Sequence, residues 1–272
     1  MNDFFRKIET NFKSRGTCLC VGLDPDPLRI PERYKSSTTP IYDFLADIVN
    51  ATSDLVCSYK PNMAFFESAG PEGLIQLAKL IEHIRNVDPE IPIILDAKRG
   101  DIGNTAKHYA TTIFDTYSAD GTTVNPYMGA DTLESFTDRQ EKGVFVLCLT
   151  SNPGYIDFEN LSVKGDPLFI HVARKMAEIN RNENIALVVG ATHPAEAEKI
   201  RNIAPDLPFL MPGIGAQGGD PAMIMKIGKT ASGLPPIVNS SRSILYPKDA
   251  TTASTREAAL KTRDLLNKYI NS

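Results

Sequence analysis

Apolar runs recur along the chain, and each is short, continuous and rich in aliphatic residues. Eight such runs occupy residues 18–24, 56–62, 91–98, 122–128, 144–151, 185–192, 207–213 and 235–241. Because their apolar positions are consecutive and do not alternate with polar ones, the runs are typical of strands covered on both faces. The pattern therefore predicts eight buried strands of a parallel sheet.

Segments of helical period separate the runs. On one face lie Leu74, Leu77, Ala78, Ile81 and Ile84 of residues 71–87, and on another lie Ile102, Ala106, Tyr109 and Ile113 of residues 102–118. Strand then helix, repeated eight times without a break in composition, predicts an α/β fold: a single (β/α)8 TIM barrel over residues 1–272. An open doubly wound sheet is the alternative. In such sheets the motif G-x-G-x-x-G often follows the first strand, but it does not follow the first apolar run of this chain.

Polar residues gather at the carboxyl ends of nearly every predicted strand. They are Asp24, Lys60, Asp96, Lys98, Asn125, Ser151, Thr192, Gln217 and Arg242. In a barrel these ends form one mouth, where barrel enzymes carry their active sites. Two long connections, residues 25–40 and 152–167, have turn-forming composition, and we expect them at the rim of the mouth or as lids.

The stretch "LDAKRGDIGNT" crowds four charges into a few positions after an apolar run. Because side chains alternate along a strand, Asp96 and Lys98 are expected to point together toward the barrel axis. A surface ion pair is the common explanation of such spacing. Lys60 weakens that explanation, since two lysines would then alternate with Asp96 and Asp101 in a partly buried place, where charges are tolerated only when they pair.

This arrangement limits the chemistry of Lys98. Two neighbouring carboxylates would stabilise its charged form, so we expect a proton donor and not the neutral amine of a Schiff-base aldolase. The ammonium would also occupy the space that a divalent cation needs between the carboxylates. No metal site is expected here.

A second polar region follows the last two strands. The segments "PGIGAQGGD" and "NSSRSIL" combine glycines, a helix start and Arg242. Backbone N–H groups, a helix dipole and a guanidinium fork all favour a bound anion, and barrels commonly bind phosphate between these two loops. A flexible linker would explain the glycines, but it leaves Arg242 unexplained.

Composition restricts the class of protein further. The net charge of −4 argues against a dedicated nucleic-acid binder. No export signal and no long apolar run is present, so membrane insertion is not expected. The four cysteines Cys18, Cys20, Cys57 and Cys148 lie in apolar runs without a C-x-x-C pair. They are expected to be buried reduced thiols, which favours a cytoplasmic location.

The motif D-x-K-x-x-D-I-x-x-T stands complete as "DAKRGDIGNT", and "GLDPD", "YKPN", "TSNPG", "PGIGAQGG" and "SSRSI" occupy the matching places around it. From about Cys18 to Leu245 the chain resembles the orotidine 5'-phosphate decarboxylase family, and its length and loops are similar to the longer bacterial branch. The resemblance implies cofactor-free decarboxylation of orotidine 5'-monophosphate to UMP and CO2, the last step of de novo pyrimidine nucleotide synthesis.

The resemblance also implies a role for each matching residue. Lys98 would protonate C6 of the pyrimidine as carbon dioxide leaves, with Asp96 beside the substrate carboxylate. The remaining implied contacts are Lys60 and Asp24 to ribose, Ser151 to the base, and Pro212, Gly215, Gln217, Gly218 and Arg242 to phosphate. Asp101, the fourth charged catalytic residue, and Thr105 would reach the neighbouring subunit's site, which implies a homodimer. Whether Asp96 repels the substrate or positions Lys98 stays open.

Two other functions remain alternatives. One is a magnesium-dependent phosphosugar lyase or decarboxylase of the same superfamily, such as a hexulose-phosphate synthase, which a chelator would inactivate. The other is a catalytically silent phosphate-binding barrel. The intact charged motif argues against the silent barrel, because binding alone does not require Lys98 between two aspartates.

Overall fold

The centre of the molecule is a ring of parallel strands. The structure, a computed structural model, describes residues 1–214 and 218–270, and the strands follow the order β2-β1-β10-β9-β8-β5-β4-β3. Their bounds are β1 Leu19–Leu23, β2 Ser58–Pro61, β3 Ile94–Arg99, β4 Gly121–Val124, β5 Gly143–Leu149, β8 Ile185–Val189, β9 Phe209–Pro212 and β10 Ile237–Ser240. Each of the eight predicted runs contains one of these strands or most of it.

The two ends of this sheet meet. Tyr59 and Asn62, in and just after β2, form parallel bridges to Ile93 and Asp96, and the Tyr59 N–H donates to the carbonyl of Pro92 at 3.0 Å. The sheet therefore closes on itself. The predicted (β/α)8 barrel is confirmed, and the open doubly wound alternative is wrong.

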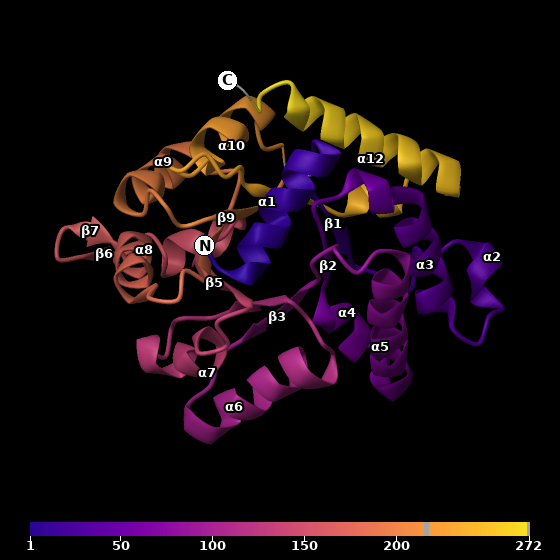
Figure 1. Ribbon diagram of the computed structural model, residues 1–272, viewed down its shortest axis with the longest axis horizontal. Helices are drawn as coiled ribbons and strands as arrows, with labels where there is room; N and C mark the ends of the chain where they lie inside the picture. Colours follow the sequence, from indigo (N-terminus) through magenta and orange to yellow (C-terminus); the bar gives the residue numbers. More distant parts are fainter. Residues whose placement is uncertain (215–217, 271–272) are drawn as a thin grey trace.

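Helices surround the barrel (Figure 1). They are α1 Asp3–Arg15, α2 Glu32–Lys35, α3 Pro40–Thr52, α4 Met63–Glu67, α5 Gly70–Val87, α6 Gly103–Thr111, α7 Glu134–Thr137, α8 Leu168–Ile179, α9 Pro194–Ile203, α10 Pro221–Gly228, α11 Arg242–Leu245 and α12 Thr252–Asn267. The two long connections carry structure of their own. Residues 25–40 include α2, and residues 152–167 contain a 3-10 helix and the short antiparallel strands β6 Ser162–Val163 and β7 Asp166–Pro167.

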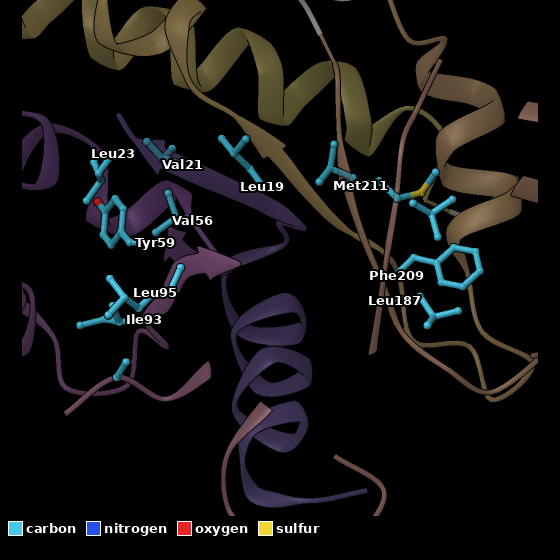
Figure 2. Packing of buried hydrophobic residues seen from close by; sticks show 14 of the residues in the cluster. Leu19, Val21, Leu23, Val56, Tyr59, Ile93, Leu95, Leu187, Phe209 and Met211 are labelled. Carbon is cyan, nitrogen blue, oxygen red and sulfur yellow. The ribbon is translucent and has the colours of Figure 1, made fainter. Parts of the chain in front are cut away.

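Alternate residues of each strand point outward and form the main core against the helices. Figure 2 shows part of it, with Leu19, Val21 and Leu23 of β1 and residues of neighbouring strands. Two predicted helix faces are wrong at one position each. Ala78 is exposed, because it lies about 100° around α5 from the buried Leu77. Leu80 is buried on that face in its place. Ile102 is 62% exposed because α6 begins only at Gly103.

The inward positions form a smaller apolar core that α1 seals at one end. Phe4, Phe5 and Ile8 of α1 pack against inward residues such as Phe145. A Cβ at Gly143 would lie 2.6 Å from the Phe4 ring. Strand β5 therefore begins with glycine at the point where α1 crosses it. Figure 1 shows α1 lying across the strands. The carboxyl ends of the strands are left to form the mouth.

The four cysteines are buried and free, as predicted. Burial raises the pKa of Cys18 and of Cys20 to about 12, so these thiols stay protonated at neutral pH. Within the described residues, no helix has both the length and the apolar character that crossing a membrane requires.

Arg201 ties together the helix ends near the sealed side of the barrel. Its guanidinium donates to five carbonyls, those of Ala204, Pro205, Leu207, Ile227 and Gly228, at 2.8 to 3.0 Å, and it stacks 3.6 Å from the ring centroid of Phe209. Burial lowers its pKa to about 10, which still leaves it charged at neutral pH. The side chain therefore anchors α9 and α10 to β9.

Replacing Arg201 with methionine is expected to lower the free energy of unfolding by about 3 kcal/mol or more, because several carbonyls lose their donor at once. Urea denaturation measures the change. Arg174→Met is the matched control, since Arg174 forms a half-exposed pair with Asp166 at 3.1 Å, and it should cost less than about 1 kcal/mol. Equal losses in the two variants would contradict the anchoring role.

Candidate active site at the carboxyl ends of the strands

A buried carboxylate organises the mouth of the barrel. Asp96 Oδ2 lies 2.7 Å from Lys60 Nζ, and its Oδ1 lies 2.7 Å from Lys98 Nζ and also accepts a 2.7 Å hydrogen bond from Thr123 Oγ1. The side chains of Lys60 and Asp96 are 6% and 7% exposed. The predicted contact of Asp96 with both lysines is therefore confirmed.

The charges outweigh the cost of burial at this cluster. Burial by itself raises the pKa of Asp96, but the attraction of Lys60 and then of Lys98 lowers it below its usual range. Burial likewise lowers the pKa of Lys60, and the charges of Asp96 and Asp24 reverse this and raise it. Asp96 and Lys60 are thus both ionised at neutral pH.

Lys98 has an unusual backbone conformation. Its φ of +46° lies in the left-handed region, which costs a residue with a side chain about 1–2 kcal/mol. The pairing of β3 with β4 shifts between Leu95 and Arg99, and the Lys98 N–H donates to Thr123 Oγ1 at 2.9 Å. At this irregularity of β3 the Lys98 side chain is 49% exposed, with its ammonium held at Asp96. Strain held by specific contacts is typical of functional sites.

Asp101 and Thr105 lie outside this cluster in the single chain. Asp101 Oδ1 accepts a hydrogen bond from the Ile102 N–H at 2.7 Å, and Thr105 is exposed on α6. Neither is among the described residues that line the two cavities of the mouth. The alternating cluster of four charges expected from the sequence is therefore wrong for one chain, which assembles three of them, Lys60, Asp96 and Lys98.

Two cavities open at the mouth and share the wall formed by Lys60, Asp96 and Pro212. The smaller, of about 260 Å³, is lined in addition by Lys98, Thr123, Leu147, Thr150, Ser151, Asn152, Val188 and Leu210. The larger, of about 500 Å³, is lined in addition by Asp24, Asp26, Arg29, Asn62, Phe65, Gly213, Ile214, Asn239, Ser241, Arg242 and Tyr246. A ligand spanning both would pass directly beside Asp96.

The larger cavity contains polar groups that find no partner in the described part of the chain. Asp24 Oδ1 and Ser241 Oγ are buried and make no hydrogen bond to residues 1–214 or 218–270. Such groups are costly unless a ligand or water satisfies them. Arg242 begins α11 at the same cavity. These features fit a ligand that carries hydroxyls and an anionic group.

The predicted phosphate loop is described in part. Pro212 lines both cavities, and Gly218 has a φ of +78° close to the start of α10. Gly215 and Gln217, also predicted to bind phosphate, lie outside the described residues.

The connection after β5 shapes the smaller cavity. Ser151 lines it, as predicted from its place at the end of β5, together with Thr150. The Glu159 carboxylate accepts hydrogen bonds from the Thr150 N–H and from Thr150 Oγ1, both at 2.7 Å. The segment 152–167 therefore fixes the wall of this cavity from outside.

Sequence reasoning missed several residues of the site. Thr123, Glu159, Asn239 and Tyr246 all contact site residues or line a cavity. Alternation along β4 could have placed Thr123 inward, and a position at the end of β10 could have indicated Asn239. Glu159 and Tyr246 lie in connections, where no periodic pattern points to them.

The fold and the site together define a class: a (β/α)8 barrel with a paired charge cluster at its mouth and an arginine-lined cavity near the last two strands, where barrel enzymes commonly bind phosphorylated ligands. The family described as "Orotidine 5'-phosphate decarboxylase / HUMPS family" matches residues 17–256. The chain belongs to this family.

Individual relatives agree with this assignment. Proteins named orotidine 5'-phosphate decarboxylase from Dechloromonas aromatica and from an Azoarcus species are each 48% identical over 269 residues, covering 98% of this chain and 99% of theirs. The structure of Leishmania donovani OMP decarboxylase is similar with a TM-score of 0.86 and 35% identity, covering 99% of both chains. The expected resemblance is therefore confirmed over nearly the whole chain.

Asp96→Asn is expected to lower the free energy of unfolding by about 3 kcal/mol near pH 7, because buried Lys60 loses its counter-charge. The folded pKa of Asp96 is lowered, so its stabilisation is complete above the ordinary carboxyl pKa of about 3.9 and is lost as pH falls below it. Urea denaturation near pH 7 and at about pH 3 measures the free energies of unfolding of the wild type and of Asp96→Asn. The difference between the two proteins should be smaller at about pH 3.

Asp115→Asn provides the control for this prediction. Asp115 pairs with Arg139 at 2.8 Å on the surface, where its side chain is 48% exposed. Its loss should cost far less stability than the loss of the buried Asp96 charge. An Asp96→Asn variant no less stable than this control near pH 7 would contradict the role assigned to the cluster.

Proposed function

We propose that this protein decarboxylates orotidine 5'-monophosphate to UMP and CO2, the last step of de novo pyrimidine nucleotide synthesis. The observation that carries the proposal is the intact motif of residues 96–105 in a chain 48% identical to named decarboxylases, with Lys98 Nζ held 2.7 Å from Asp96 at a ligand-sized cavity. The shared family description also covers the HUMPS branch. The near-complete coverage of the named relatives favours the decarboxylase.

The two cavities suit the two halves of this nucleotide. The pyrimidine fits the smaller cavity, beside Ser151 and Lys98. Ribose would lie at the shared wall, where Lys60 and the unpartnered Asp24 Oδ1 are available to its hydroxyls. Phosphate would lie at Arg242, Pro212 and Gly218, and Gly215 and Gln217 complete the proposed phosphate contacts.

Lys98 is the proposed proton donor. Loss of CO2 breaks the bond to C6 and leaves its electron pair in a carbanion that no ring carbonyl delocalises. A preorganised ammonium stabilises such localised charge, and a proton from Lys98 Nζ then completes UMP. Reactions of this kind need about 20 kcal/mol of transition-state stabilisation. One lysine does not supply that, so binding energy from the phosphate end must contribute.

The contacts of Asp96 support a positioning role. Its two oxygens receive two ammonium groups and the Thr123 hydroxyl, which fix Lys98 in place. Repulsion between Asp96 and the substrate carboxylate remains the alternative, but a carboxylate so fully paired repels a neighbour less. The same pairing leaves Asp96 little capacity to bind a metal, which supports a cofactor-free reaction.

A homodimer is part of this proposal. Asp101 and Thr105 would enter the neighbouring subunit's site and supply the fourth charge. Close to Asp101 lie Ile102, which is 62% exposed, and Met128, which is 45% exposed and whose side chain lies beside Gly100. Such a patch is typical of a surface that another protein covers. A cytoplasmic location is also proposed, and the four buried free thiols support it.

Lys98→Ala is expected to reduce kcat for orotidine 5'-monophosphate by at least about a thousandfold, because both the proton donor and the stabilising charge are lost. The loss of substrate absorbance measures turnover, with EDTA present throughout. Lys79→Ala, on the exposed face of α5, should retain wild-type turnover. A folded wild type without turnover would contradict the function and favour a silent barrel, whereas activity that EDTA abolishes would favour the magnesium-dependent relatives.

Mixing Lys98→Ala with Asp101→Ala tests the shared sites. Each variant alone should be nearly inactive. After random reassociation, half of the dimers are mixed and each mixed dimer has one intact site, so about one quarter of the wild-type activity should return. A mixture that exchanges subunits, as shown by differently tagged chains, but stays inactive would contradict the contribution of Asp101 across the interface.

A further inference from the structure

Arg29 is a second arginine at the larger cavity. It lies in the connection 25–40, far in sequence from Arg242, yet both side chains line the same space of about 500 Å³. The sequence motifs of the site do not include Arg29, and Arg29 is exposed.

Tyr246 holds the guanidinium of Arg29 in place. The Arg29 Cζ lies 4.2 Å from the centroid of the Tyr246 ring. That ring stacks on Phe44, and its hydroxyl accepts from the Asp26 N–H at 2.6 Å and donates to the carbonyl of Asp24 at 3.2 Å. A guanidinium stacked through its face keeps its N–H edge available for an anion.

Tyr246 also follows Arg242 by one helical turn. Its N–H donates to the carbonyl of Arg242 at 3.1 Å, at the end of α11. One aromatic residue therefore links the positions of both arginines at the cavity.

The charges of the cavity leave both arginines without a carboxylate partner. Across residues 1–214 and 218–270, neither Arg29 nor Arg242 forms an ion pair, whereas Lys60 and Asp96 satisfy each other. Asp26, an acidic residue of the same connection, also lines this cavity, and its Oδ1 accepts the Leu28 N–H at 3.0 Å. Two unpaired guanidiniums fit a ligand group with nearly two negative charges, as a phosphate monoester has at neutral pH.

We propose that Arg29 binds the phosphate of the substrate together with Arg242, which lines the same cavity. This inference rests on the proposed function for the identity of the substrate. It assigns the connection 25–40 a part in binding the anion, in addition to forming the rim.

The test replaces Arg29 with methionine and, separately, with glutamine and lysine. Arg29→Met and Arg29→Gln should each raise KM for orotidine 5'-monophosphate, and the inhibition constant of inorganic phosphate, by about tenfold or more. Arg29→Lys should lie between these variants and the wild type, because it keeps the charge but loses the fork. Binding of uridine, which has no phosphate, should stay unchanged.

Arg33→Met is the matched control. Arg33 belongs to the same connection and stacks 4.5 Å from the ring centroid of Tyr34, but it is not among the described residues lining the cavity. It should leave the constants for substrate and phosphate as in the wild type.

Unchanged phosphate inhibition in Arg29→Met and Arg29→Gln would overturn the inference. Equal losses of UMP binding and uridine binding in these variants would also overturn it, because they would indicate a purely structural role. Failure of the wild type to turn over the substrate would instead contradict the proposed function. Calorimetric binding of inorganic phosphate to wild type and Arg29→Met would still decide the role of Arg29 in that case.

Discussion

The site depends on the Asp96 carboxylate and the three groups that surround it. Removing a carboxylate from water costs several kcal/mol even after the protein relaxes. Attraction between unit charges 4 Å apart is about 4 kcal/mol at an effective dielectric constant of about 20, so two ammonium groups offset this cost where one would barely do so. Lys60, which is buried, and Lys98, which is half exposed and more screened, together keep Asp96 ionised in a place with 7% exposure.

The same interaction is linked to the closure of the barrel. Lys60 stands on β2 and Asp96 on β3, the two strands at the ends of the sheet order. Regular pairing between them is limited to bridges such as that of Asn62 with Asp96. The buried Lys60–Asp96 pair therefore crosses the seam where the ladder is weakest, so closure of the barrel and assembly of the charge cluster support one another.

The sequence predicted the features that depend on local pattern. Continuous apolar runs predicted the strands, and the end of each run predicted the position of Lys60, Asp96 and Ser151 at one mouth. Features that depend on contacts between distant segments were not predicted. Thr123 is one of many threonines, and only its place opposite Asp96 and Lys98 distinguishes it. The left-handed backbone of Lys98 accompanies that contact, and nothing in "DAKRG" before its glycine predicts a positive φ.

Asp101 was misplaced within a single chain for a related reason. Alternating charge in the sequence suggested that all four groups meet in one chain. Asp101 instead lies between the end of β3 and the start of α6 at Gly103, where it accepts a hydrogen bond from its own neighbour. Sequence spacing does not distinguish a contact within a chain from one between chains. The proposed contact of Asp101 across a dimer interface comes from the resemblance to the family, and the exposed Ile102 beside Asp101 supports that proposal.

Under the proposed function, the shared wall between the two cavities would link binding of the substrate to its chemistry. Lys60 and Asp96 face both spaces, whereas Lys98 faces only the smaller one and Arg29 and Arg242 only the larger. Contacts with a remote anion can therefore hold the reacting carbon near Lys98 without themselves touching it, which is how binding energy is used to lower a barrier. Because the charges at the wall are already paired before a ligand arrives, they need little reorganisation during the reaction, and this preorganisation makes electrostatic stabilisation effective.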